Sequence, residues 1–302
     1  MTMADRTTLP FVSVMIPTLN RPDAIIQIAT DFLAQVYPSL EVIVVDQSQA
    51  VNQGLARLEQ RDGRLKVIRT NVIGTCHARN LGVREAQGSI VVFSDDDNRI
   101  RDTSFVWQHI QNYGDPTIGG VGGRVLDRNT ELNREQTGPV CTVTKTGKVF
   151  PNATSLTRQL INAPRGGNMS FRKSVILGVG GFDERFRGNA MREETDFSLR
   201  VVEGGWRIIY DPLASNEHLA LAGGSRSSDR ITWYEDFFFN ESLFFLKHFP
   251  RRYLPILLFR KVRPMIICAV YYGRFQPRAL TAPWRAFRQA WRLVQGPGTI
   301  TT

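Results

Sequence analysis

Short apolar runs alternate with amphipathic stretches along the first hundred residues. The runs at residues 11–16, 41–45, 65–70 and 90–93 are rich in β-branched residues, which is typical of strands buried on both faces. The stretches between them predict helices over residues 24–36, 50–61 and 77–87, with Asp23 as the expected cap of the first helix. Such alternation predicts βαβ units, and therefore an α/β fold with a mostly parallel, twisted sheet flanked by helices.

Polar side chains follow three of these predicted strands. The clusters are Pro17-Thr18 with Asn20, Asp46-Gln47-Ser48, and Asp95-Asp96-Asp97. Ligands of parallel sheets bind outside the carboxyl ends of the strands, so we expect the three clusters to meet in one crevice. Each cluster alone is compatible with ordinary turn chemistry. Three adjacent carboxylates repel one another, and a hard cation or a phosphate-bound metal would neutralise them.

The second half of the chain is less regular. A helix over residues 105–113 and a strand over 119–126 are predicted, and the polar residues 127–160 are expected to form a long, mobile hairpin or lid. Paired glycines before Asn168 permit close approach of the backbone to a ligand. Acidic residues then open a predicted helix at 194–203, a common arrangement because carboxylates complement the helix dipole.

Known phosphate-binding fingerprints are missing after the first predicted strand. The sequence contains neither GxGxxG nor GxxxxGK[ST] there, which argues against a dinucleotide-binding fold and a P-loop enzyme. A phosphate site without a glycine cradle needs a metal and basic side chains. Arg79, on the helix that opens at the carboxyl edge of the sheet, is a candidate, and a surface arginine is the alternative.

The net charge of +10 belongs to the C-terminal segment. Residues 242–302 contain eleven Lys and Arg and no Asp or Glu, so the first 241 residues carry 27 basic and 28 acidic side chains. Trp284, Phe287, Trp291 and Val294 recur at helical spacing among arginines. This pattern predicts a helix in an anionic membrane interface, or else a helix packed on the rest of the chain.

Localisation is predicted from what the sequence lacks. No apolar run reaches the ~20 residues of a spanning helix, and the N-terminus has no apolar signal-peptide region. Three scattered cysteines, Cys76, Cys141 and Cys268, imply neither disulfides nor a zinc site and suit a reducing compartment. We therefore expect a cytoplasmic protein, peripheral on the inner face of the cell membrane.

An ordered set of motifs gives the chain a resemblance to a known family. The motifs are VSVMIPTLNR at 12–21, EVIVVDQS at 41–48, ARNLG at 78–82, DDD at 95–97, GGNMSFRK and GGFDERF within 166–186, and EETD at 193–196. Over residues 10–226 the chain resembles the inverting glycosyltransferases of family 2, which have the GT-A fold. The resemblance implies a catalytic domain over 1–230, with a nucleotide-sugar-binding half at 1–125 and an acceptor half at 160–226. Residues 231–302 would form a separate basic, helical segment.

The resemblance also implies roles for particular residues. The nucleotide base and ribose would contact the first loop and the second strand end, namely Pro17, Thr18, Asn20, Arg21, Asp46 and Gln47. Arg79 would lie near the diphosphate, and Gly167 and Asn168 would line the donor-sugar and acceptor side. Asp95 and Asp97 correspond to the family's DxD element. Asp97 would be the main ligand of Mg²⁺ or Mn²⁺, Asp95 a sugar or ribose contact beside the metal, and Asp96 the least important of the three.

The remaining assignments concern the base and a further metal contact. Glu194 falls where the family has its catalytic base, with Glu193 and Asp196 beside it, and His218 where members supply another metal or diphosphate contact. Two positions depart from the family pattern. Gln47 replaces an aspartate, which weakens the statement about base recognition. The usual Glu-Asp pair reads Glu193-Glu194, which leaves open which of the two is the base.

The sequence thus predicts a metal-dependent, inverting transfer from a nucleoside-diphosphate sugar to a hydroxyl of a saccharide or lipid-linked acceptor, in polysaccharide or glycoconjugate synthesis. A metal-dependent nucleotidyltransferase is one alternative, but a glycine- and lysine-bearing signature would then be expected near the first strand. An RNA-binding protein is another, suggested by the pI of about 9.9. The basic residues lie in the tail and no RRM or KH signature occurs, so no nucleic-acid partner is expected.

Overall fold

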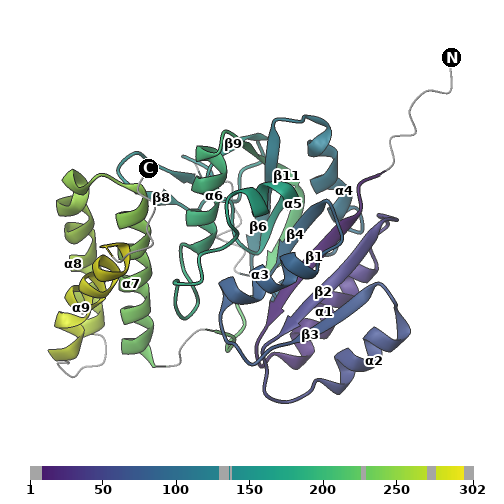
Figure 1. Ribbon diagram of the computed structural model, residues 1–302, viewed down its shortest axis with the longest axis horizontal. Helices are drawn as coiled ribbons and strands as arrows, with labels where there is room; N and C mark the ends of the chain where they lie inside the picture. Colours follow the sequence, from purple (N-terminus) through teal and green to yellow (C-terminus); the bar gives the residue numbers. More distant parts are fainter. Residues whose placement is uncertain (1–8, 129–135, 137, 226–228, 271–276, 296–302) are drawn as a thin grey trace.

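The computed structural model of the protein describes residues 9–128, 136, 138–225, 229–270 and 277–295 (Figure 1). Within these residues the main sheet has nine strands, in the order β3-β2-β1-β4-β10-β6-β11-β5, with β9 paired to β11. The strands are β1 (Val12–Thr18), β2 (Leu40–Asp46), β3 (Leu65–Arg69), β4 (Ile90–Ser94), β5 (Asn98–Arg99), β6 (Ile118–Asp127), β9 (Gln159–Ile161), β10 (Asn168–Arg172) and β11 (Arg207–His218).

Helices cover both faces of this sheet, because the side chains of its strands are apolar on both sides. In β4, Ile90 and Val92 join the hydrophobic cluster beneath α1 and α4, whereas Val91 and Phe93 join the cluster beneath α3 and α6. This arrangement confirms the predicted α/β class. The helices of the first 225 residues are α1 (Pro22–Leu33), α2 (Gln53–Arg61), α3 (Thr75–Glu85), α4 (Phe105–Ile110), η1 (Gln111–Gly114), α5 (Lys173–Gly178) and α6 (Glu193–Glu203).

The direction of β10 brings distant parts of the sequence together. Strands β1 to β4 run parallel, but β10 is antiparallel to β4 and places Asn168 opposite Ser94. The residues that enter β10 therefore lie beside the residues that leave β4. In this way Gly167 comes to lie next to Asp95, and Gly166 next to Arg79, which are neighbours that the glycine doublet alone does not name.

One local prediction was wrong, and another was confirmed in part. Helix α1 begins at Pro22, so Asp23 lies in its first turn and does not cap it; proline suits this position because its φ is already helical. Residues 138–160 are packed and form the hairpin of β7 (Thr142–Val143) and β8 (Val149–Phe150). The hydroxyl of Tyr210 donates to two backbone carbonyls of this segment, and Ala153 is buried. The rest of the expected excursion, 129–135 and 137, lies outside the described residues.

The C-terminal helices extend the core of the first 225 residues. They are α7 (Arg230–His248), η3 (Arg251–Tyr253), α8 (Leu254–Val270) and α9 (Pro277–Gln295). Phe238 and Leu243 of α7 belong to the same buried cluster as Phe171 and Phe197, and α9 adds the alanine stripe Ala282, Ala286 and Ala290 to it. The boundary predicted at residue 230 therefore does not separate two hydrophobic cores. No described helix is both long and apolar enough to span a bilayer.

Candidate active site

A cleft of about 490 Å³ opens at the carboxyl ends of β1 and β4, beside the start of β10 and of α6. It brings together most of the residues that the sequence nominates. Those lining it are Pro17, Thr18, Arg21, Gln47, Arg79, Asp95, Asp96, Asp97, Gly167, Glu193, Glu194 and His218. Asn20 and Asp46 line a smaller adjoining cavity of about 260 Å³, which shares Thr18 and Arg21 with the main cleft.

The three aspartates after β4 have different surroundings. The Asp95 side chain is 39% exposed, and its carboxylate lies 3.2 Å from Nη2 of Arg79. Asp96 is buried and accepts hydrogen bonds from the Thr18 hydroxyl at 2.7 Å and from Arg21 Nη1 at 2.6 Å. Burial raises the pKa of Asp96 to about 6, against the opposing effect of Arg21 and the Thr18 hydroxyl. Asp96 thus joins the loop after β1 to the loop after β4.

The Asp97 carboxylate lies between the guanidinium of Arg21 and the imidazole of His218. Its carboxylate is 3.1 Å from Arg21 Nη1 and 3.7 Å from Nε2 of His218, at the end of β11. The other imidazole nitrogen of His218, Nδ1, lies 3.0 Å from a carboxylate oxygen of Asp127. A carboxylate that holds one imidazole nitrogen and orients the other is the usual arrangement behind a metal-binding histidine.

These groups fit a divalent cation that also binds phosphate. Asp97 offers a carboxylate oxygen and His218 offers Nε2. Asp95, two residues before Asp97 in the sequence, lines the same cleft and offers a second carboxylate. Among the described residues no group of three His, Cys, Asp or Glu side chains could hold a metal ion by itself. Mg²⁺ is commonly held by one or two carboxylates together with substrate phosphates, and the donor set here matches that mode.

Arg79 is fully buried and connects the two acidic clusters. Its guanidinium pairs with Glu193 of α6 through Nη1 and with Asp95 through Nη2, and Nη2 also donates to the carbonyl of Gly166 at 3.1 Å. The surface-arginine alternative is therefore wrong. Its predicted contact with a diphosphate stays a prediction, and its observed contacts are with the carboxylates of the cleft.

The two glutamates at the start of α6 differ in the contacts that their carboxylates make. Burial raises the pKa of Glu193 to about 8, and the guanidinium of Arg79 opposes this rise. Glu194 lines the cleft, is half-buried, and has no hydrogen-bond or ion-pair partner among the described residues. Glu193 is thus fixed by Arg79, whereas the carboxylate of Glu194 is available to a ligand.

The paired glycines before β10 approach the acidic residues as expected. A Cβ on Gly166 would lie 3.0 Å from Nη2 of Arg79, and one on Gly167 would lie 2.6 Å from a carboxylate oxygen of Asp95. Any side chain at residue 167 would therefore displace Asp95. Asn98 fixes the same stretch, because its amide donates to the Gly167 carbonyl at 2.7 Å.

Asn168 does not line the cleft, contrary to prediction. It is fully buried within the sheet, where its amide nitrogen contacts the carbonyls of Arg124 and Ala214 and its oxygen lies 3.0 Å from Nε2 of His109. Burial lowers the pKa of His109 to about 4, so the imidazole is neutral. Asn168 thus joins β10, β6, β11 and α4, and its amide is not available to a sugar.

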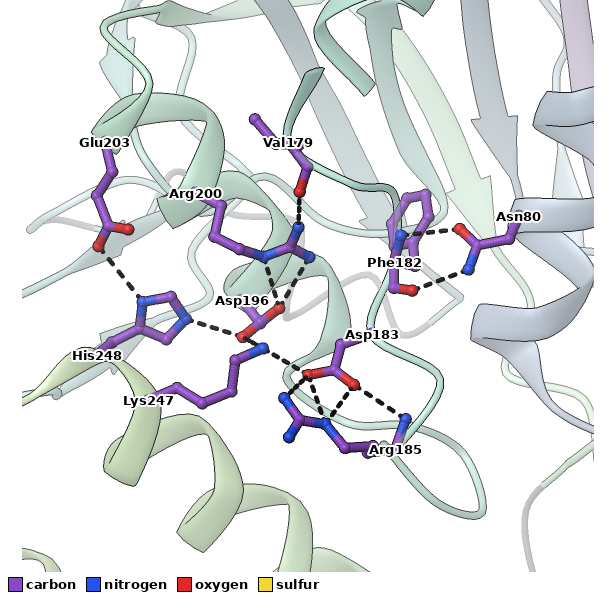
Figure 2. A network of polar contacts seen from close by, with 10 residues as sticks. All are labelled: Asn80, Val179, Phe182, Asp183, Arg185, Asp196, Arg200, Glu203, Lys247 and His248. Atoms are coloured by element: carbon purple, nitrogen blue, oxygen red, sulfur yellow. Dashed lines mark hydrogen bonds and ion pairs between the residues drawn. The ribbon is translucent and has the colours of Figure 1, made fainter. Parts of the chain in front are cut away.

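Asp196 is also directed away from the cleft, so its assignment beside the base was wrong. Figure 2 shows its carboxylate between Arg200 of its own helix and Lys247 and His248 of α7. Lys247 Nζ lies 2.5 Å and His248 Nε2 lies 2.8 Å from it. These partners lower the pKa of Asp196 although burial opposes the change. Asp196 joins α6 to α7.

The cleft is also lined by residues 223–225, a segment to which the sequence assigned no role. Arg21 reaches across it and donates to the carbonyls of Leu221 and Gly223, which hold the segment 221–225 over one side. Gly223 and Gly224 have positive φ angles of 88° and 71°, and their doublet was the only signal in the sequence for this tight approach. Further lining residues are Leu19, Thr75, Asn98, Val125, Pro151, Arg165, Gly166, Asn189, Met191, Arg192 and Ser225.

Comparison with solved structures identifies the class of the fold. A mannosyltransferase from Pyrobaculum calidifontis, in complex with GDP-Man and Mn²⁺, aligns over 97% of this chain and 77% of its own, with a TM-score of 0.60 and 20% identity. GalNAc-T7 with UDP, GalNAc and Mn²⁺ aligns over 97% of this chain and 59% of its own, with a TM-score of 0.63 and 13% identity. The fold is that of the GT-A glycosyltransferases.

Sequence comparison gives the family. A model for glycosyl transferase family 2 matches residues 13–176, which is more than half of the chain, and the chain belongs to that family. Among its relatives are the O-antigen biosynthesis protein RfbC of Myxococcus xanthus, 27% identical over 74% of the chain, and the poly-β-1,6-N-acetyl-D-glucosamine synthase of Staphylococcus aureus, 24% identical over 87%. The chain spans 18% of the former and 64% of the latter, less than two thirds of either.

Proposed function

We propose that the protein transfers a sugar from a nucleoside diphosphate to a hydroxyl of a saccharide or lipid-linked acceptor, with inversion at the anomeric carbon. The observation that carries the proposal is the presence of Asp95, Asp97 and Glu194 around one cleft of family 2 architecture. Two carboxylates beside an oriented histidine suit a cation and a diphosphate. A glutamate whose carboxylate has no hydrogen-bond or ion-pair partner among the described residues suits proton removal from an acceptor. Relatives named for O-antigen and polysaccharide synthesis support the substrate class.

Different residues around the cleft have different roles in the proposed reaction. Asp97, with Asp95 and His218, would hold Mg²⁺ or Mn²⁺, which as a Lewis acid stabilises negative charge on the leaving diphosphate. Glu194 accepts the proton of the acceptor hydroxyl as that oxygen attacks from the face opposite the diphosphate. Arg79 pairs with Asp95 through one guanidinium nitrogen and with Glu193 through the other, and so keeps both carboxylates in place. The adjoining cavity with Asn20 and Asp46 is the proposed site of the nucleoside.

A panel of nucleotide sugars with Mn²⁺ tests this proposal. The expected products are a glycosylated acceptor and a nucleoside diphosphate. Release of pyrophosphate instead would identify a nucleotidyltransferase and overturn the proposal. Thermal shift with each donor separates binding from turnover, because a donor that binds without a suitable acceptor still stabilises the folded state.

Asp97→Asn tests the metal assignment. We expect the variant to lose Mn²⁺-dependent turnover by a factor of ~10–100 or more, because an amide is a weaker ligand and leaves the diphosphate charge less well neutralised. The measurement is initial rate against Mn²⁺ concentration after treatment with a chelator. Asp115→Asn, at an exposed pair with Arg207, is the matched control. Equal metal dependence in both variants would contradict the assignment.

We also propose that the protein is peripheral on an anionic cytoplasmic membrane, and that α8 is the contact. The expected aromatic face of α9 is not the best candidate, because Phe287 and Trp291 are half-buried and the helix packs through its alanines. Helix α8 instead exposes Ile256, Phe259, Val262 and Ile266, with Phe259 at 79%. Their spacing places them on one face of a helix. The exposed Arg251 and Arg252 precede this face, and no acid occurs after residue 241, so its charge complements anionic lipid.

Vesicle flotation tests the membrane contact. The wild type is expected to float with vesicles that contain phosphatidylglycerol and to remain below with phosphatidylcholine alone. The Phe259→Ser/Ile266→Ser variant should lose several-fold of this binding, since less apolar surface enters the interface. Leu177→Ser, at an exposed leucine of α5, is the control. Equal flotation of the wild type and the double variant would contradict a contact through α8.

A further inference from the structure

The loop of residues 187–192 leads directly into the proposed base and has an unusual backbone. Gly188, Ala190 and Arg192 have positive φ angles of 58°, 51° and 82°. Ala190 and Arg192 are not glycines, so these conformations are costly and persist only where the surroundings enforce them. Arg192 precedes the first residue of α6, and Glu194 is the second. The position of the Glu194 carboxylate therefore depends on what holds this loop.

Helix α7 provides the restraints. Asn240 is fully buried, and its side chain makes a reciprocal pair with the backbone of Arg187: Oδ1 accepts from the Arg187 N–H at 2.9 Å, and Nδ2 donates to the Arg187 carbonyl at 2.9 Å. The Arg187 guanidinium stacks on the ring of Phe239 at 3.7 Å. Arg192, at the other end of the loop, pairs with Glu241. Three consecutive residues of α7 thus hold both ends of the loop.

The same helix also holds α6 beyond the glutamates. Figure 2 shows Lys247 and His248 of α7 around Asp196, and Lys247 also reaches Asp183 at 2.6 Å. These contacts fix the first turn of α6 from the side that faces α7. The loop before α6 is held separately, with Asn240 and Glu241 of α7 at its two ends.

We infer that Asn240 is a positioning residue for the reaction, which it affects by holding the loop 187–192 and so the carboxylate of Glu194. The inference rests on the proposed function, in which Glu194 is the base. Asn240 does not line the cleft, so it acts through Arg187 and the loop. Displacement of a reacting group by ~1 Å can cost about 10²-fold in rate, so a small shift of this loop is sufficient. The C-terminal segment is then part of the catalytic unit.

Asn240→Ala tests the inference. We expect kcat to fall by ~10-fold or more while the KM for the donor stays within ~2-fold, because donor contacts lie on the other side of the cleft. Amide hydrogen exchange of residues 188–194 should become faster, since the loop loses the two hydrogen bonds by which Asn240 holds Arg187 at its start. Both are measured well below the melting temperature of the variant. Glu241→Gln weakens the ion pair with Arg192 at the other end of the loop. It should lower kcat and speed the exchange of residues 188–194 by less than Asn240→Ala does. It replaces Asn240→Ala as the test if that variant does not fold.

Glu235→Gln is the control on the same helix, because Glu235 pairs with Arg285 of α9 and lies outside these contacts. It should leave kcat and the exchange of residues 188–194 unchanged. Wild-type kcat in Asn240→Ala, or a lower kcat with unchanged exchange at 188–194, would overturn the inference. Exchange requires no turnover, so failure of the wild type to transfer any sugar would refute the proposed function while leaving the dependence of the loop on Asn240 measurable.

Discussion

Glu194→Gln is expected to abolish sugar transfer while leaving donor binding and the melting temperature unchanged. The amide has the shape of the carboxylate but cannot accept the acceptor proton, and general-base catalysis typically contributes ~10²–10⁴-fold. Stability should not change, because Glu194 has no hydrogen-bond or ion-pair partner among the residues that the structure describes. The measurements are single-turnover transfer, thermal shift with donor and Mn²⁺, and the unfolding midpoint.

Glu193→Gln is the comparison that separates the two glutamates. Glu193 is paired with the buried Arg79, so at a pH above its pKa of about 8, where the carboxyl is ionised, loss of its charge should lower the melting temperature and leave measurable transfer. If Glu194→Gln retains near-wild-type turnover, or Glu193→Gln eliminates transfer at an unchanged melting temperature, the base has been assigned to the wrong residue. The sequence could not make this distinction, since both glutamates occupy adjacent positions in one motif.

The cleft could be located from the sequence because its signals are local. An apolar run that ends in Asp95–Asp97, and others that end in polar clusters, specify strands and their carboxyl ends without knowledge of the tertiary structure. The edge of a parallel sheet then brings these ends together. The glycine doublet at 166–167 is a local signal of the same kind, since it indicates a close approach, and the structure brings it against Arg79 and Asp95 in the cleft. Its contact with a ligand stays a prediction.

The predictions for Asn168 and Asp196 failed because their partners are remote in the sequence. Asn168 is satisfied by His109 and by carbonyls of β6 and β11, and Asp196 by Lys247 and His248 of α7. A buried polar group requires such partners, but its residue type alone does not reveal them. For α9 the sequence left two alternatives open, a helix in a membrane interface or a helix packed on the rest of the chain. The structure packs α9 on the core through its alanines, a contact face that the aromatic spacing did not indicate.

Arg79→Met is expected to destabilise the protein by about 3–5 kcal/mol at pH 8, the usual cost of leaving one member of a buried ion pair without its partner. Burial already raises the pKa of Glu193 to about 8, and without the guanidinium it should rise further. The folded variant would then hold a proton that the unfolded chain releases above its ordinary pKa of 4.5. The folded wild type holds this proton too, up to its own pKa of about 8, so both proteins should lose stability in parallel up to that pH. Stability of the variant relative to the wild type should therefore fall as pH rises above 8, by at most about 1.4 kcal/mol per pH unit.

Denaturant unfolding of the wild type and Arg79→Met at pH 5, pH 8 and pH 9 measures this dependence. Adding Glu193→Gln to Arg79→Met removes the buried titratable group, so the double variant should be more stable than Arg79→Met at pH 8 and should lose less stability between pH 5 and pH 8. Asp95 also loses a partner, but its side chain is 39% exposed and water can replace the guanidinium. If the double variant is as unstable as Arg79→Met at pH 8, the loss arises from the packing of Arg79 against Phe93 and Phe182, not from the charge on Glu193.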